Sequence, residues 1–125
     1  MNIAEIHSLP FVSMSIIYKG KELKLQKVLL DTGSASTLLN ADIVREIGIV
    51  PAGDDEVETI RGVGGVEYVY TKYMDAVIVD GAMLKCFKVE VGSMDYGMEI
   101  DGILGFDFLK LARATINVGV MKLTV

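Results

Sequence analysis

The sequence has few of the residues that build disulfides and metal centres. Its 125 residues include one cysteine, one histidine and no tryptophan. Cys86 therefore cannot form a disulfide within the chain, and with His7 alone beside it there is no thiol or imidazole cluster of the kind that holds zinc. We expect no metal and no cofactor, a buried and inert thiol at Cys86, and His7 at the surface.

Long apolar runs and basic clusters are also missing. No stretch approaches the roughly 18 apolar residues of a membrane-spanning helix, and the N-terminus has no apolar core of signal-peptide length. The 12 Lys and Arg residues are scattered, and 17 Asp and Glu residues outnumber them. Because nucleic-acid phosphates require a basic patch, we expect no nucleic-acid partner. We also expect no membrane segment in this chain and a cytoplasmic location. A membrane anchor outside this stretch is compatible with that expectation.

Apolar residues, by contrast, are abundant: they make up 51% of the chain, together with 13 glycines, many of them at the ends of β-branched runs. This combination is typical of strands joined by tight turns. The length is that of a single domain covering residues 1–125. The predicted fold class is all-β (mainly β), a closed or semi-closed barrel with two short helices.

The predicted elements follow the apolar pattern and its breaks. Strands are expected at 11–18, 22–30, 56–61, 66–79, 83–91, 115–118 and 120–125. Short helices are expected at 41–47, capped by Asn40 and stopped by Gly48, and at 107–112. The strand at 120–125 alternates apolar and polar residues, which is typical of an edge strand that pairs within the chain or with a partner subunit.

The first candidate for chemistry is Asp31-Thr32-Gly33, where an apolar strand breaks at once on a turn. The sheet behind Asp31 would fix its carboxylate, and the turn in front would expose it. Thr32 offers a hydroxyl that can hydrogen-bond to neighbouring backbone, and Gly33, which has no Cβ, lets another chain approach closely. An ordinary Asx turn is the alternative explanation of this triplet.

Two further stretches are candidates. Residues 60–65 (Ile-Arg-Gly-Val-Gly-Gly) form a glycine-rich tip between two strands, typical of a simple turn or of a flap that closes over a ligand. The spacing fits neither a dinucleotide fingerprint nor a phosphate loop. Residues 101–105 (Asp-Gly-Ile-Leu-Gly) are typical of a buried strand that enters a helix, with Asp107 as the helix cap.

Taken in order, these three stretches resemble those of retroviral-type (retropepsin-like) aspartic proteases. Over residues 11–125 the chain is similar to a bacterial single-domain member of that group, within the wider pepsin and retropepsin clan. Residues 31–36 (Asp-Thr-Gly-Ser-Ala-Ser) are close to the signature of pepsin-like lobes. Residues 101–109 resemble the second motif of both pepsin-like and retroviral enzymes.

The sequence departs from the retroviral pattern in two places. Retroviral enzymes generally carry an Arg just after the second motif, paired with an Asp four positions beyond the catalytic one. Phe106 and Ala35 occupy those positions here, so both partners are absent together. The stretch after Gly105 is also longer than in retroviral enzymes.

The resemblance implies a retropepsin-like acid-protease barrel whose single lobe homodimerises, and an aspartic endopeptidase activity. In such enzymes two carboxylates share one proton and activate a water. The sequence has one Asp-Thr-Gly triplet, so a second copy would supply the second Asp31 across a two-fold axis. The expected substrate is a peptide or protein segment, extended and apolar near the cut.

The resemblance also implies the site residues. Thr32 would brace the two active-site loops, and Ile103 and Leu104 would pack beneath or beside them and line apolar subsites. The catalytic residues are then Asp31, Thr32 and Gly33. The substrate-binding residues are Ser34, Ala35, Gly62, Val63, Gly64, Gly65, Ile103 and Leu104.

Two other classes of function stay open at this point. One is a non-catalytic homodimer of the same fold that binds peptides or serves as a scaffold. The other is a metal-dependent hydrolase that uses Asp31 with Asp101, although the sequence has no carboxylate cluster at metal-ligand spacing.

Overall fold

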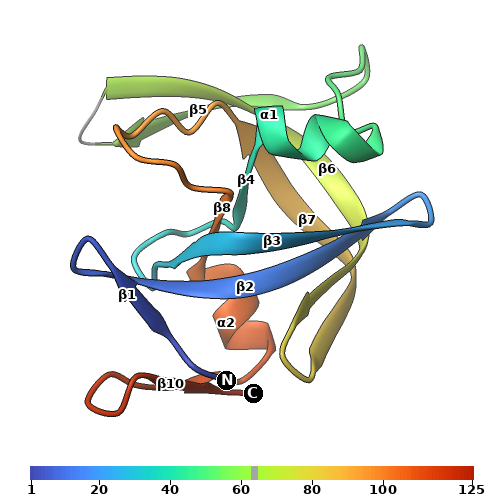
Figure 1. Cartoon of the computed structure of the whole chain (residues 1–125). Coiled ribbons are helices and arrows are strands. Elements are labelled where there is room, and N and C mark those ends of the chain that lie inside the picture. Colours follow the sequence, from blue (N-terminus) through green and yellow to red (C-terminus); the bar gives the residue numbers. More distant parts are fainter. Residues whose placement is uncertain (63–64) are drawn as a thin grey trace.

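A closed ring of hydrogen-bonded strands forms the body of the molecule (Figure 1). The computed structural model describes residues 1–62 and 65–125. The strands pair in the order β1-β2-β3-β8-β4-β7-β6-β5, and a further pairing of β2 with β6 closes the ring. The strands are β1 (Ala4–Ile6), β2 (Leu9–Tyr18), β3 (Lys21–Leu30), β4 (Leu38–Asn40), β5 (Val57–Gly62), β6 (Gly65–Val79), β7 (Ala82–Gly92), β8 (Gly102–Leu104), β9 (Thr115–Asn117) and β10 (Lys122–Thr124).

The prediction of a mainly β barrel is confirmed. Every strand expected from the apolar pattern is present, with ends within two residues of the predicted ones. Two strands of three residues each, β1 and β4, were not predicted. Such short segments carry too little periodicity to be distinguished from loops, and β4 is a strand because it lies between β8 and β7 in the ring.

The helices are α1 (Ala41–Val44), the 3-10 turn η1 (Arg45–Ile47) and α2 (Phe106–Leu111). As predicted, the Asn40 side chain accepts a hydrogen bond from the Asp42 N–H, and Gly48 ends the turn with a φ of 88°. In the described part of the chain, no helix combines the length and the apolar character that crossing a membrane requires.

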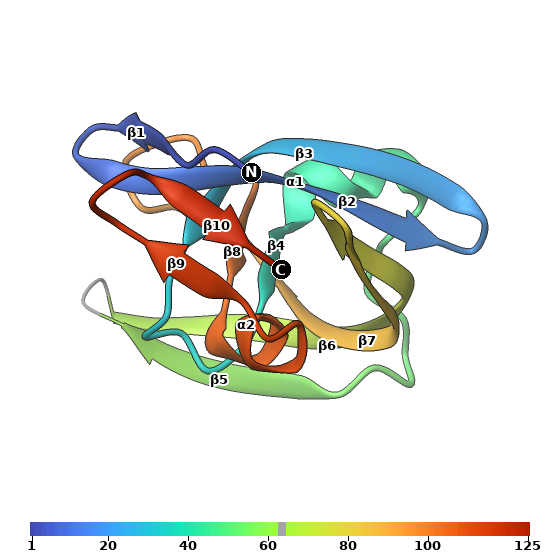
Figure 2. The same cartoon turned by 90° about the horizontal axis from the view of Figure 1, so that it is seen from below.

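The terminal strand predicted at 120–125 pairs within the chain. β10 is antiparallel to β9, and Lys122 of β10 also forms a bridge with Asn2. Figure 2 shows the resulting β9–β10 hairpin beside β1. The hairpin and the N-terminal segment therefore form one continuous surface at this end of the molecule, where His7 is exposed as predicted.

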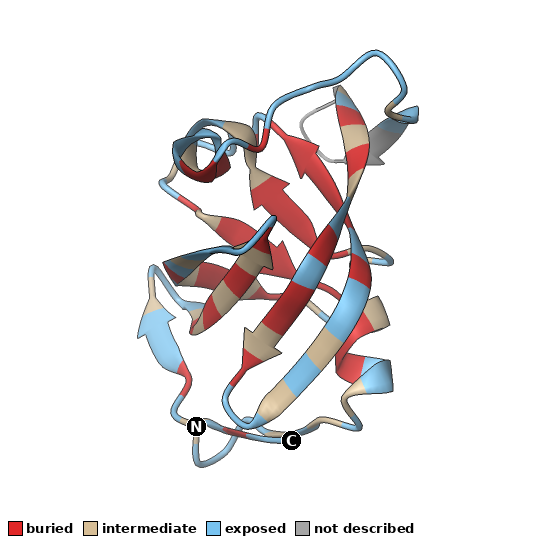
Figure 3. Cartoon of the chain, turned by 90° about the vertical axis from the view of Figure 1, so that its right-hand side faces the viewer, coloured by how far each residue is buried: buried red, intermediate tan, exposed pale blue. Residues whose placement is uncertain are grey.

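The ring encloses a core of buried apolar side chains. Figure 3 marks the buried residues in red along the strands. Residues of β2 alternate between core and surface, and the buried ones on the core side are Val12, Met14, Ile16 and Tyr18. The core extends to Phe108 of α2, whose ring meets that of Phe87 edge-on at a centroid distance of 5.6 Å. A separate small cluster consists of Phe11, Leu38, Met94, Ile100 and Ile103.

Cys86 is exposed, so the prediction of a buried thiol is wrong. The prediction rested on the usual burial of free cysteines in strands, but Cys86 has a φ of 51°, in the left-handed region. The β6–β7 ladder skips it, passing from the Met74–Phe87 pair to the Ala76–Lys85 pair. This break in the ladder leaves the thiol outside while the neighbouring Phe87 ring stays in the core.

We expect Phe108→Ala to lower the free energy of unfolding by about 3–5 kcal/mol, because the truncation removes apolar contacts and leaves a cavity. The matched control is Phe106→Ala in the same helix. Its side chain is 52% exposed, and the expected loss is below about 1 kcal/mol. Urea unfolding at one fixed protein concentration measures both variants. Equal losses would contradict the placement of Phe108 in the core.

Candidate active site

The turn that follows β3, residues 31–36, holds the candidate catalytic carboxylate, and it is called the catalytic turn after this candidate role. The Asp31 N–H donates to the carbonyl oxygen of Leu104 at 3.0 Å, which ties the start of the turn to the end of β8. The Gly33 N–H then donates to Asp31 Oδ1 at 2.9 Å, and the Ser34 N–H donates to the Asp31 carbonyl at 3.2 Å. One carboxylate oxygen of Asp31 is thus oriented by backbone, and the side chain is partly exposed.

Parallel pairing of β3 with β8 brings the first and second motifs together. Leu29 is opposite Ile103, and Leu30 is opposite Leu104. The turn then passes so close to Gly105 that a Cβ there would overlap the Ser36 carbonyl oxygen and lie 2.9 Å from that of Ser34. Only glycine fits at position 105, which explains why the second motif ends on this residue.

A buried hydrogen-bond network supports this contact, and its central residue, Thr37, was not predicted from the sequence. The side chain of Thr37 is fully buried. Its Oγ1 accepts a hydrogen bond from the Gly105 N–H at 3.1 Å and donates to Asp107 Oδ1 at 2.8 Å, while its N–H donates to Asp107 Oδ2. The sequence pattern that could have pointed to Thr37 was a threonine six positions after Asp31 and next to the apolar residues of β4.

Asp107 was predicted to cap α2, and this is wrong. The helix begins at Phe106, so the capping position falls on Gly105 and Asp107 lies inside the first turn. Its carboxylate accepts the hydroxyl and the N–H of Thr37, and Oδ1 also accepts the N–H of the following Phe108 at 2.8 Å. Asp107 therefore links α2 to the segment after the catalytic turn.

The other predicted site residues lie on both sides of this turn. Thr32, Gly33 and Ala35 are exposed, and the Ser34 hydroxyl donates to the Ser36 carbonyl at 2.7 Å. Ile103 and Leu104 lie beneath the turn. Ile103 is 8% exposed, and Leu104 is completely buried. Leu104 can therefore pack beneath the turn but cannot line a subsite.

The predicted flap is a hairpin of β5 and β6. The two strands pair up to Gly62 and Gly65, and Val63 and Gly64 lie outside the described residues. Figures 1 and 2 both show the ends of these strands on the same side of the molecule as the catalytic turn. Of the predicted flap residues, Gly62 and Gly65 thus lie at the end of a hairpin on the side that carries Asp31.

A cavity of about 340 Å³ adjoins the catalytic turn. Its lining residues from the two terminal hairpins and the turn include Leu9, Pro10, Leu30, Asp31, Thr32 and Val118. Leu9 is 36% exposed and Val118 is 73% exposed. The Asp31 carboxylate therefore stands at the edge of an open apolar surface.

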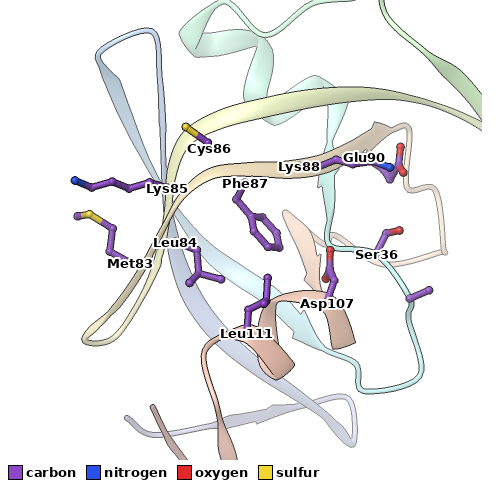
Figure 4. A pocket seen from close by; sticks show the side chains of 11 residues that line it. Ser36, Met83, Leu84, Lys85, Cys86, Phe87, Lys88, Glu90, Asp107 and Leu111 are labelled. Carbon is purple, nitrogen blue, oxygen red and sulfur yellow. The ribbon is translucent and has the colours of Figure 1, made fainter.

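A larger hollow of about 780 Å³ lies between β7 and α2 (Figure 4). Leu84 and Phe87 from β7 and Leu111 from α2 point into it, and Ser36 lies at its opposite side. Of the predicted site residues that the structure describes, Ala35 alone lines this hollow, so the hollow flanks the candidate site. Within residues 1–62 and 65–125, no three His, Cys, Asp or Glu side chains gather as metal ligands.

Comparisons with known proteins agree with this geometry. The family model described as aspartyl protease matches residues 14–108. The chain is similar in structure to a retropepsin-like aspartic protease from Rickettsia conorii, with a TM-score of 0.63 and 18% sequence identity, over 88% of this chain and 85% of that one. None of the curated proteins matches. At this identity the structural likeness shows a shared retropepsin-like fold, as the sequence predicted.

We expect Thr37→Val to lower the free energy of unfolding by about 1–3 kcal/mol, because it leaves the buried Gly105 N–H without an acceptor. Thr37→Ser is the control. It keeps the hydroxyl, loses one methyl group, and is expected to cost about 0.8 kcal/mol. Urea denaturation compares the two. A serine variant as unstable as the valine variant would contradict a supporting role for the hydroxyl.

Proposed function

The chain belongs to the aspartyl protease family, and on this premise we propose that it is an aspartic endopeptidase that works as a homodimer of residues 1–125. The observation that carries the proposal is the position of the Asp31 carboxylate. Its carboxylate is held by the Gly33 N–H, lies at the end of a strand pair and is open to solvent on its other side. A catalytic acid requires this combination of fixed position and access.

One such carboxylate is half of the required machinery. Hydrolysis by this route uses two carboxylates about 3 Å apart that share one proton. The chain has a single Asp-Thr-Gly triplet, so the second carboxylate is the Asp31 of another copy. A two-fold axis that passes beside Asp31 brings the two identical turns face to face.

In the proposed reaction, the ionised Asp31 takes a proton from a water bound between the two chains. The water oxygen then attacks the peptide carbonyl carbon, and the protonated Asp31 of the other copy donates its proton to the carbonyl oxygen. In the resulting tetrahedral intermediate, the first Asp31 passes the proton that it took from the water to the nitrogen, and the C–N bond breaks. One hydroxyl of the intermediate returns a proton to the second Asp31, which leaves a carboxylic acid, an amine and the starting pair of carboxyl groups.

The surface around Asp31 supports contact with a second copy. If the axis passes beside Asp31, the residues around the adjoining cavity must lie in or next to the interface. Those that are exposed and apolar include Leu9 and Val118, and Val120 follows in the same hairpin turn with 61% exposure. Exposed apolar side chains gathered in this way are typical of an interaction surface.

The proposed substrate is an extended peptide bound between the catalytic turns and the β5–β6 hairpins, with apolar side chains near the cut. Apolar surface next to the turn supports this preference. Phe106 is exposed at the start of α2, and its N–H donates to the Ser34 carbonyl at 2.7 Å. The absent retroviral Arg and Asp are thus replaced by the exposed apolar side chains of Phe106 and Ala35.

We expect Asp31→Asn to reduce cleavage of an unfolded protein substrate to below about 1% of the parent rate, since a positioned acid or base contributes about 10²–10⁴-fold. The amide is nearly isosteric with the carboxylate, so the dimer should persist. Gel-based cleavage assays and sedimentation test the two statements. Undiminished cleavage would contradict the catalytic assignment. A parent protein that dimerises and binds peptides without cleaving them would favour a peptide-binding or scaffold domain.

We expect Val118→Asp to weaken the dimer at least tenfold, because it places a charge without a partner in the proposed interface. Tyr73→Asp is the matched control. Tyr73 is also highly exposed, but it lies near Lys19, at the opposite end of β2 and β3 from Asp31. Sedimentation at several concentrations measures both variants. A parent protein that stays monomeric at every concentration would contradict the homodimer.

A further inference from the structure

The outer end of the β5–β6 hairpin extends beyond the barrel. β6 pairs with β7 as far as the Tyr70–Val91 pair. Between that pair and Gly65, the partner of β6 in the ladder is β5. Among the described residues, no ladder pairing joins the outer part of the hairpin to the barrel, so an attachment there falls to side chains.

Glu67 makes such an attachment. It lies on β6 beyond the last β6–β7 pair, and its carboxylate reaches the loop that follows β7. Oε1 accepts the Met94 N–H at 3.0 Å, Oε2 accepts the Tyr96 hydroxyl at 3.1 Å, and the Ser93 hydroxyl lies 3.5 Å from Oε1. The carboxylate thus takes the place of the backbone acceptor that a longer ladder would provide.

Gly92, the last residue of β7, makes room for this carboxylate. A Cβ at position 92 would lie 2.6 Å from Glu67 Oε1 and 2.9 Å from Val69 Cγ1. Both distances are shorter than real Cβ contacts, so a side chain there would displace Glu67. Gly92 therefore leaves the space that the Glu67 carboxylate occupies.

The loop that Glu67 contacts is connected to the floor of the candidate active site. Met94 is 2% exposed and belongs to the small cluster with Phe11 and Ile103. Ile103 is paired with Leu29, two residues before Asp31. The hairpin is therefore linked through Glu67 and Met94 to the residues directly beneath the catalytic turn.

The base of the hairpin has separate anchors. Lys72 Nζ lies 2.9 Å from Asp55 Oδ2, and the Thr71 N–H donates to the Glu56 carbonyl. The hydrogen bond from Lys72 lowers the pKa of Asp55. These contacts hold the hairpin where it leaves the barrel, whereas Glu67 acts closer to the glycine-rich end.

We propose that Glu67 is a positioning residue that fixes the β5–β6 hairpin relative to the floor of the active site and so pre-organises it to bind the peptide substrate. This inference rests on the proposed function for its consequence and on the contacts above for its mechanism. A hairpin held in place loses less conformational freedom when substrate binds. Loss of the carboxylate should therefore weaken peptide binding more than it slows the chemical step.

We expect Glu67→Ala to raise KM for a peptide substrate about fivefold or more, with kcat within about twofold of the parent value. Glu67→Gln should recover most of the loss, because its amide oxygen can accept the Met94 N–H and its amide nitrogen can donate to Tyr96. The matched control is Glu58→Ala, which removes an exposed carboxylate from the other strand of the same hairpin. An unchanged KM in Glu67→Ala would overturn the proposal.

Two measurements test the attachment without catalysis. Backbone hydrogen exchange at residues 57–62 and 65–70 should be faster in Glu67→Ala than in Glu58→Ala. Burial and the Glu67 charge raise the pKa of Tyr96 to about 12. In Glu67→Ala that pKa should move towards 10, as read by ultraviolet titration against the same variant carrying Tyr96→Phe. Unchanged exchange would overturn the attachment whether or not the protein is a protease.

The proposed function can fail separately. If the parent protein cleaves no peptide, the dissociation constant of a peptide with a non-cleavable bond replaces KM as the readout. Weaker binding in Glu67→Ala then supports the positioning role in a non-catalytic domain. Equal binding, or a parent protein that binds no peptide, overturns that role.

Gly92→Ala gives an independent test, because its new methyl group would displace the Glu67 carboxylate. Alone it should raise KM much as Glu67→Ala does. In the Glu67→Ala background it should add less than its separate effect, since the carboxylate that it displaces is already gone. Fully additive effects on KM would overturn the link between Gly92 and Glu67.

Discussion

The parallel contact between β3 and β8 is the interaction on which the rest of the candidate site depends. It places residues some 70 positions apart side by side, and the Asp31 N–H donates to Leu104 at the point where both strands end. A carboxylate at the end of one strand would move with its turn. Here the second strand supports that turn from beneath, so that Asp31 combines access to solvent with a fixed backbone. This combination makes an exposed acidic residue usable in catalysis.

The support is built from glycine and from buried polar groups. Gly105 lets the turn pass over the second motif, and the Gly105 N–H left beneath that turn finds its acceptor in Thr37. Asp107 completes the arrangement by receiving Thr37 and holding it against α2. An unpaired donor in such a network would lower the stability of the fold, because each buried donor has few acceptors within reach. When every donor is paired, the network favours one arrangement of its residues. The geometry of the turn is thus tied to the position of the helix.

Two surface regions lie on either side of Asp31. On one side of Asp31 the terminal hairpins expose apolar side chains, among them Leu9 and Val118. On the other side the loop after β7 joins the small cluster under the turn to the β5–β6 hairpin through Glu67. In the proposed dimer the first surface would meet the second copy, and the hairpin would close on the substrate. Both proposals depend on the position of the catalytic turn, which the strand contact determines.

The sequence by itself determined the elements and the place of the acid. Apolar periodicity and glycines act within a few residues, so they located the long strands, the helix that begins after Asn40 and the break at Asp31. The tertiary structure alone decided what depends on contacts between distant segments. It made β4 a strand between β8 and β7, turned Cys86 outward, used Asp107 as a partner of Thr37 and directed Glu67 to Met94. No local pattern carries such information, because each of these roles belongs to a pair of residues brought together only when the ring closes.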